Sequence, residues 1–137
     1  MKILMVKKLN NSLVCAFDSD FEEFKKIKAN ETIEVEIVKK RNIKFHRKFY
    51  ALIKMVYQNQ EQYSNIQYLR KDLIIESGFY EIRYGIHGEE IKEAKSISFA
   101  SMNEFEFSEL YNSVLDTIVR CFNFDRQDII ENVEKFF

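Results

Sequence analysis

Residues 39–60 read KKRNIKFHRKFYALIKMVYQNQ, and this stretch decides what fold the chain can adopt. Its apolar residues recur every three or four positions, which is the period of an amphipathic α-helix. The periodicity predicts a helix from Ile43 to about Gln60. One side of this helix is expected to be buried, and it carries Phe45, Phe49, Leu52 and Val56.

The same stretch is basic and free of acid. Between Lys39 and Lys54 it holds seven of the chain's 21 Lys and Arg residues and no Asp or Glu. A turn of about 100° per residue places the helical cations opposite the apolar side. On the flank between them, flat rings could lie against a nucleic-acid base while the cations hold phosphates. The candidate binding residues are Lys39, Lys40, Arg41, Lys44, His46, Arg47, Lys48, Tyr50, Lys54 and Tyr57.

Two other interpretations of this basic side stay open. Any amphipathic helix exposes a polar side to water, and here that side carries Lys and Arg. The absence of Glu favours a functional role, because a helix that is merely soluble gains from mixed charges four residues apart. Alternatively, the basic helix docks on Asn103–Phe137, which carries eight carboxylates and three cations, within one protomer or between two.

Strands are expected before this helix. Lys2–Lys8 and Ser12–Phe17 flank Asn10 and Asn11, and this predicts a β-hairpin because Asn tolerates positive φ. The segment Thr32–Val38 alternates apolar and polar residues, so it predicts a third strand.

A short helix is expected between the hairpin and the third strand. Ser19 followed by Glu22 is a capping-box pattern, and the helix should end near Lys28. Its apolar side would carry Phe21, Phe24 and Ile27.

More helices and a second hairpin are expected after residue 60. A helix over about Ile66–Ser77 should end at Gly78. The segments Tyr80–Ile86 and Ile91–Phe99 then predict a hairpin around residues 87–90.

Two helices close the chain. Asn103 caps a long helix, and a last helix starts at about Asp125. Strands first and helices later predict an α+β fold, in which a small, mostly antiparallel sheet packs with four to five helices. With no Pro and three Gly, residues 1–137 should form a single domain. The apolar residues of these two helices are Phe107, Leu110, Tyr111, Val114, Leu115, Ile118, Ile129, Ile130, Val133, Phe136 and Phe137.

Charge and cysteine content limit where the protein acts and what it binds. The net charge of −1 means that nucleic-acid binding must be local to the basic stretch. Cys15 and Cys121 lie in apolar runs, so we expect buried, reduced thiols in the host cytoplasm. No signal peptide or membrane span is expected, because no apolar run approaches about twenty residues.

The sequence offers no pattern for catalysis, for a metal or for a cofactor. His46, His87 and the two cysteines show no metal-ligand spacing. No Gly-x-Ser-x-Gly elbow surrounds Ser96, Ser98 or Ser101. We therefore expect a protein that is not an enzyme.

Two segments resemble a family of uncharacterised phage and prophage proteins. They are residues 41–52, RNIKFHRKFYAL, and residues 95–102, KSISFASM, followed by the Glu106–Tyr111 segment. The order of elements is also similar to the NinB (Orf) recombination mediators of lambdoid phages. That second likeness implies a non-enzymatic dimer that binds single-stranded DNA and the host single-strand-binding protein. It adds Asn42 to the candidates and supports Arg41, Arg47 and Lys48.

The leading hypothesis is a phage accessory protein that binds single-stranded nucleic acid or a nucleoprotein as a homodimer, without catalysis. The alternative is a protein that inhibits a host defence enzyme by binding to it through a surface of mixed charge and aromatic side chains.

Overall fold

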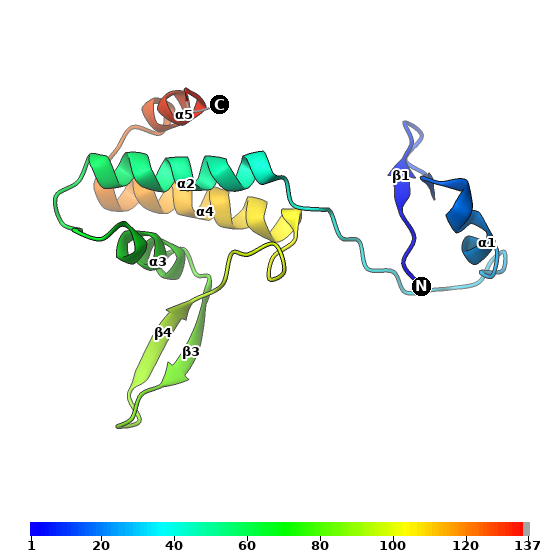
Figure 1. The fold of residues 1–137 in the computed structure, drawn as a ribbon, viewed down its shortest axis with the longest axis horizontal. Helices are drawn as coiled ribbons and strands as arrows, with labels where there is room; N and C mark the ends of the chain where they lie inside the picture. Colours follow the sequence, from blue (N-terminus) through cyan, green and yellow to red (C-terminus); the bar gives the residue numbers. More distant parts are fainter. Residues whose placement is uncertain (136–137) are drawn as a thin grey trace. The chain divides into compact units, whose positions relative to one another are not determined.

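The computed structural model describes residues 1–135, in which helices and short strands combine into an α+β fold, as predicted (Figure 1). The expectation of one sheet is wrong, because the strands form two separate antiparallel pairs. The chain divides into two units, Met1–Glu36 and Ile37–Phe137. The single domain that the sequence led us to expect stays a prediction.

The first unit begins with the predicted hairpin. Strand β1 spans Met5–Lys7 and pairs with β2, Leu13–Cys15. Asn11 takes φ +67°, and the Asn10 side chain accepts a hydrogen bond from the Ser12 amide at 3.1 Å. These two asparagines make the turn for the reason that the sequence indicated.

The predicted capping box of the first unit is wrong. A 3₁₀ turn, η1, spans Asp18–Asp20 and includes Ser19, and helix α1 covers only Phe21–Phe24, so it ends earlier than predicted. Glu22 pairs with Lys25 at 3.3 Å, so its carboxylate turns along the helix and not back toward Ser19. The helix therefore has no side-chain cap.

The predicted third strand is also wrong. Residues 31–40 are exposed and have no regular secondary structure. Alternation alone does not make a strand, because a strand needs a partner for its backbone hydrogen bonds. In residues 1–135, β1 and β2 pair only with each other, and the same holds for β3 and β4.

The second unit contains the four predicted longer helices. These are α2 (Ile43–Gln58), α3 (Ile66–Glu76), α4 (Glu104–Phe122) and α5 (Arg126–Glu134). Each helix begins at a residue whose side chain accepts a backbone N–H of the first turn, which is the usual start of a helix. These caps are Asn42, Asn65, Asn103 and Asp125.

The core lies among these helices, and α2 presents its predicted apolar side to it. Figure 1 shows α2 running alongside α4. Phe49 is fully buried, and Phe45 meets Phe107 and Tyr111 of α4 with ring centroids 5.1 Å apart in each pair. The predicted orientation of α2 is therefore confirmed. Phe136 and Phe137 lie outside the described residues.

A second hairpin projects from the helices (Figure 1). It consists of β3, Tyr80–Tyr84, and β4, Glu90–Ala94, and Gly78 ends α3 at φ +92°. Both strands are shorter than predicted, since β3 ends at Tyr84 and not at Ile86, and β4 ends at Ala94 and not at Phe99. Strand β4 cannot continue to Phe99, because the last backbone hydrogen bond between the strands joins the Lys95 N–H to the Phe79 carbonyl, where β3 begins.

The two cysteines are free, and only one is partly buried. Cys15 is half-buried, whereas Cys121 is exposed, so the predicted burial of Cys121 is wrong. In the last turns of α4, Ile118 is buried while Cys121 points to solvent. Consecutive residues of a helix point to different sides of it, so an apolar run near its end contains both buried and exposed residues. The prediction treated the whole run as buried.

Candidate nucleic-acid interface

The basic segment is fixed to the start of α4 by one carboxylate. The backbone N–H of Asn42 donates to Glu104 Oε2 at 2.8 Å, and the backbone N–H of Glu104 donates to the Lys39 carbonyl at 3.0 Å. Asn42 also caps α2, because its Oδ1 accepts the Lys44 amide at 2.9 Å. The side chain of Asn42 is therefore engaged in positioning the helix.

Arg41 joins the two motifs quoted from the sequence. Its guanidinium donates to the Ile97 carbonyl and lies over two rings, with centroids at 3.7 Å for Phe107 and 4.7 Å for Phe99. Burial lowers the pKa of Arg41, and the Glu104 carboxylate acts in the opposite direction. Arg41 is thus half-buried against the second unit, and its buried Nε atom has no hydrogen-bond partner in the described residues.

His46 is half-buried beside Arg41. Its Nδ1 lies 2.6 Å from Arg41 Nη2, and its ring stacks on Phe107 with centroids 5.8 Å apart. Burial lowers the pKa of His46, and the nearby positive charges of Arg41 and Arg70 lower it further. A neutral His46 accepts a hydrogen bond from Arg41, so we assign it a packing role.

The other cations of the basic stretch remain at the surface. Lys48 is half-buried, with Nζ 5.5 Å from the centroid of the Tyr111 ring. Within residues 1–135, no cation of the Lys39–Lys54 stretch forms an ion pair. We call the exposed members the α2 basic face: Lys39, Lys40, Lys44, Arg47 and Lys54.

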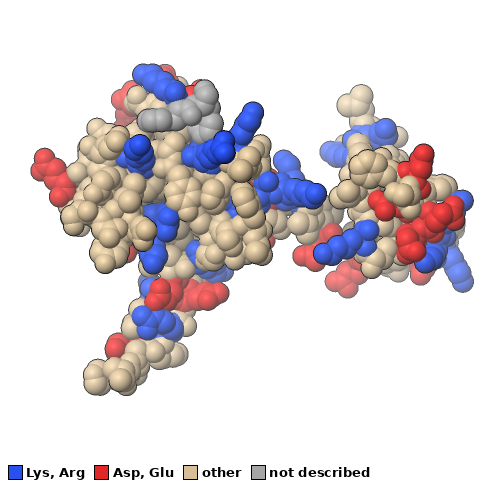
Figure 2. All heavy atoms as spheres, viewed as in Figure 1, with Lys and Arg blue, Asp and Glu red and all other residues tan. Residues whose placement is uncertain are grey.

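Figure 2 shows Lys and Arg side chains over the side of this unit on which α2 lies. Red acidic side chains of the same unit appear mainly toward the edges of that view and on the hairpin. The local field of this side is therefore positive, although the whole chain carries a net charge of −1.

The predicted aromatic flank is only partly available. Tyr50 is 38% exposed, and its hydroxyl accepts a hydrogen bond from Arg70 Nη1 at 3.1 Å. Tyr57 is half-buried and donates its hydroxyl to the Ser64 carbonyl at 3.0 Å. Tyr50 is therefore the ring that a ligand could reach.

Arg70 is the residue that sequence reasoning missed. It lies on α3, twenty positions from Tyr50, with its guanidinium carbon 5.3 Å from the Tyr50 ring centroid. The predicted helix from Ile66 to Ser77 contains Arg70, but nothing in its spacing indicates which side chain of α2 it would meet.

Within residues 1–135 of one chain, α2 contacts the C-terminal helices through apolar side chains and not through the electrostatic docking that was one of the expectations. In the described residues, α2 packs on α4 and α5 through apolar side chains and forms no ion pair with them. Two cations of the C-terminal helices form ion pairs that do not involve α2. Arg126 of α5 pairs with Asp116 of α4, and Arg120 of α4 pairs with Glu76 of α3. Docking between two protomers stays a prediction.

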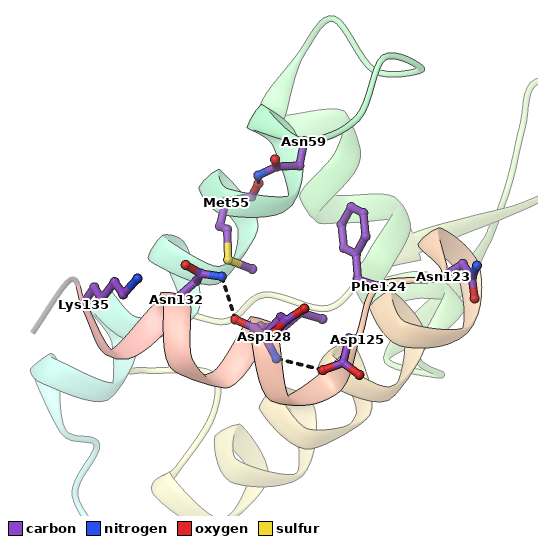
Figure 3. A pocket seen from close by; sticks show the side chains of 9 residues that line it. Met55, Asn59, Asn123, Phe124, Asp125, Asp128, Asn132 and Lys135 are labelled. Atoms are coloured by element: carbon purple, nitrogen blue, oxygen red, sulfur yellow. Dashed lines mark hydrogen bonds between the residues drawn. The ribbon is translucent and has the colours of Figure 1, made fainter.

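A pocket of about 520 Å³ lies between the end of α2 and the start of α5 (Figure 3). Met55 and Phe124 give it apolar walls. Two of its polar groups are already used, because Asp125 caps α5 through the Asp128 amide, and the Asn132 side chain donates to the Asp128 carbonyl. We therefore assign no ligand to this pocket.

Two structural features are absent from residues 1–135. No helix in this part of the chain is long and apolar enough to cross a membrane. No three side chains of His, Cys, Asp or Glu come together in a group that could hold a metal ion.

These features define a small α+β protein with an exposed basic helix anchored to its core by Arg41 and Glu104. Residues 1–66 and 58–135 match the family described as Protein of unknown function (DUF1367), and the chain belongs to this family. No curated protein and no solved structure matches the chain.

Proposed function

We propose that this protein binds single-stranded nucleic acid through the α2 basic face. The observation that supports this proposal best is that five cations lie exposed there without an acidic partner in the described chain. Such a group of cations repels itself, and binding to phosphates relieves this repulsion while the nucleic acid releases its condensed counterions.

Tyr50 and Arg70 give the basic face a place for a base. The Tyr50 ring is partly exposed on the flank of α2, and the guanidinium of Arg70 lies over it. Aromatic side chains next to cations bind single strands with little sequence preference, since every base has a flat face. We assign stacking to Tyr50 and phosphate contacts to the lysines and arginines around it.

The remaining candidates receive positioning roles in this proposal. Arg41, Asn42 and His46 hold the start of α2, and Tyr57 is tied to the loop before α3. Their loss would act on binding through the structure of the helix and not through contact with the ligand.

The biological setting follows from the resemblance noted in the sequence. We propose a phage or prophage accessory protein of the host cytoplasm that works without catalysis, as the NinB-like mediators do. Its partners would be a second copy of the chain and the host single-strand-binding protein.

The test is fluorescence anisotropy of a labelled single-stranded oligonucleotide at several salt concentrations. Lys44→Glu with Arg47→Glu should abolish most of the binding and lower the salt slope by about 1.4, since each phosphate contact contributes about 0.7. The matched control is Lys7→Glu with Lys8→Glu, which makes the same charge change on the exposed first hairpin. Equal affinity of the two double variants would contradict the proposal.

The alternative, a protein that inhibits a host enzyme by binding to it, draws support from one observation. Phe99 and Phe105 stay about half exposed beside the start of α4. Exposed aromatic side chains are common anchors of protein interfaces. In an affinity purification from infected cells, Phe99→Ala with Phe105→Ala would release such a partner, whereas the double variant of the basic face would not.

A further inference from the structure

The second hairpin has an outer edge that no other strand covers. At its two ends, Lys95 N donates to Phe79 O and Gly85 N donates to Glu89 O. These two hydrogen bonds determine which residues of β3 direct their backbone N–H and C=O groups toward β4. In an antiparallel ladder, hydrogen-bonded residue pairs alternate with pairs that are not hydrogen-bonded. The backbone groups of Tyr80, Ile82 and Tyr84 therefore point away from β4.

This edge is accessible and lacks two of the common protections of edge strands. Ile82 is 51% exposed and Tyr84 is 67% exposed. The edge of β3 contains no proline and no bulge, which are features that keep strands from pairing. On β4, in contrast, Lys92 occupies the centre of the outer edge, as is common in protected edges.

The sequence of β3 is complementary to itself when two copies run antiparallel. It reads Tyr80-Glu81-Ile82-Arg83-Tyr84. With a two-fold axis at Ile82, each Glu81 lies opposite the Arg83 of the second copy, and each Tyr80 lies opposite a Tyr84. Cross-strand pairs of opposite charge and of aromatic rings both stabilise a sheet.

The hydrogen-bond pattern fits the same register. Ile82 faces Ile82, and both have outward backbone groups, so the three outward N–H groups of each chain meet outward carbonyls. Within the hairpin, Arg83 also forms an ion pair with Glu93 at 2.5 Å. A shift by two residues sets Glu81 opposite Glu81 in one direction and Arg83 opposite Arg83 in the other, and like charges directly opposite each other destabilise a sheet. Only the register centred on Ile82 therefore satisfies both the backbone and the charges.

We propose that the outer edge of β3 pairs with the same edge of a second copy of this chain. The product is a four-stranded antiparallel sheet in the order β4-β3-β3-β4 with two-fold symmetry. Phe79 and Ala94 pack the base of the hairpin against the core, and two more strands would stabilise the exposed remainder, since an isolated pair of strands is marginally stable in water. The inference gives a surface to the homodimer named in the proposed function, but its test needs no nucleic acid.

The first test is a pair of charge variants of the full chain, measured by sedimentation equilibrium over a concentration series. Wild type should be a dimer. Glu81→Arg or Arg83→Glu puts like charges opposite each other twice, and each should raise the dimer Kd by about tenfold or more. An equimolar mixture of the two variants should form a heterodimer, because every Arg then faces a Glu. A monomeric wild type, or single variants as dimeric as wild type, would overturn the proposal.

The second test separates the two edges of the hairpin. Ile82→Pro removes an N–H that points outward, so the pairing of β3 with β4 is kept and the dimer should be lost. Lys92→Pro makes the same change on the outer edge of β4 and should leave the dimer intact. If Ile82→Pro still dimerises like wild type, the edge of β3 is not the interface.

Discussion

Residues that look equivalent in the sequence have different roles in the structure. The run from Lys39 to Lys44 reads as one block of positive charge, yet Arg41 is half-buried against Phe107 while Lys40 stays exposed. The resemblance singled out two motifs of the chain, and Arg41 is where they meet, since it donates to Ile97 of the second motif. A planar guanidinium stacks on a ring with its flat face while its N–H groups donate in fixed directions at its edge, and the compact ammonium of lysine does not reproduce this geometry.

Arg41→Lys should therefore destabilise the fold, although it keeps the charge. We expect a loss of about 2 kcal/mol in the free energy of unfolding, from a charged hydrogen bond and the contact with two rings. Urea denaturation followed by circular dichroism measures it. Lys40→Ala is the control and should change stability by less than about 0.5 kcal/mol. Equal stability of the two variants would show that Arg41 is an ordinary surface cation.

His46 makes stability depend on pH. Its pKa is lowered in the fold from the value of 6.5 expected in the unfolded chain. The unfolded state therefore binds a proton more readily, and stability is highest above pH 6.5 and falls as the pH drops below it. Melting temperatures between about pH 7 and 5 should show this loss in wild type and a smaller loss in His46→Gln.

The control for this pH dependence is the other histidine, His87, which is exposed in the turn of the second hairpin. His87→Gln should keep the wild-type profile. If it were His87→Gln that flattened the profile, the burial of His46 would not be its origin.

At the scale of helices and strands, the period of the apolar residues predicted the four longer helices correctly but not the third strand. Helix α2 was predicted to within two residues of its end, because four of its turns place apolar side chains on one side. The strand over Thr32–Val38 has an equally regular pattern, but a strand depends on a partner far away in the sequence. The pairing of Arg70 with Tyr50 is missing from the prediction for the same reason, since α2 and α3 had no predicted orientation.

Phe49 tests the orientation of α2. It is fully buried at the centre of the apolar side, next to Phe107 with ring centroids 5.7 Å apart. Phe49→Ala should cost about 3–5 kcal/mol of stability. Arg47→Ala, two residues earlier on the exposed side, should be close to neutral. Thermal denaturation of both variants decides the matter, and two equal melting temperatures would mean that α2 is turned the other way.

For the whole molecule, the position of the buried core along the chain determines which part is expected to fold independently. All of the fully buried apolar side chains in the described chain belong to residues 49–133, within the second unit. The first unit has 36 residues and no buried side chain, which is below the size that supports an independent core.

A chain that begins at Ile37 should therefore fold by itself. We expect its melting temperature to stay within a few degrees of the full chain's value, because no described core residue is removed. Circular dichroism and dispersed amide signals in NMR spectra would check this. An unfolded product would show that residues 1–36 are required for the second unit to fold.

The bonds of Glu104 also set an order of events during protein synthesis. The Asn42 amide needs a carboxylate that lies 62 positions later in the chain. A ribosome that adds about 5–20 residues per second takes roughly 3–12 seconds to make that stretch. During this interval the start of α2 has its own Asn cap but not its anchor, and the rings that will cover Arg41 do not yet exist. The nascent chain therefore shows both sides of α2 to the cell, and the basic side is ready before the apolar side is covered.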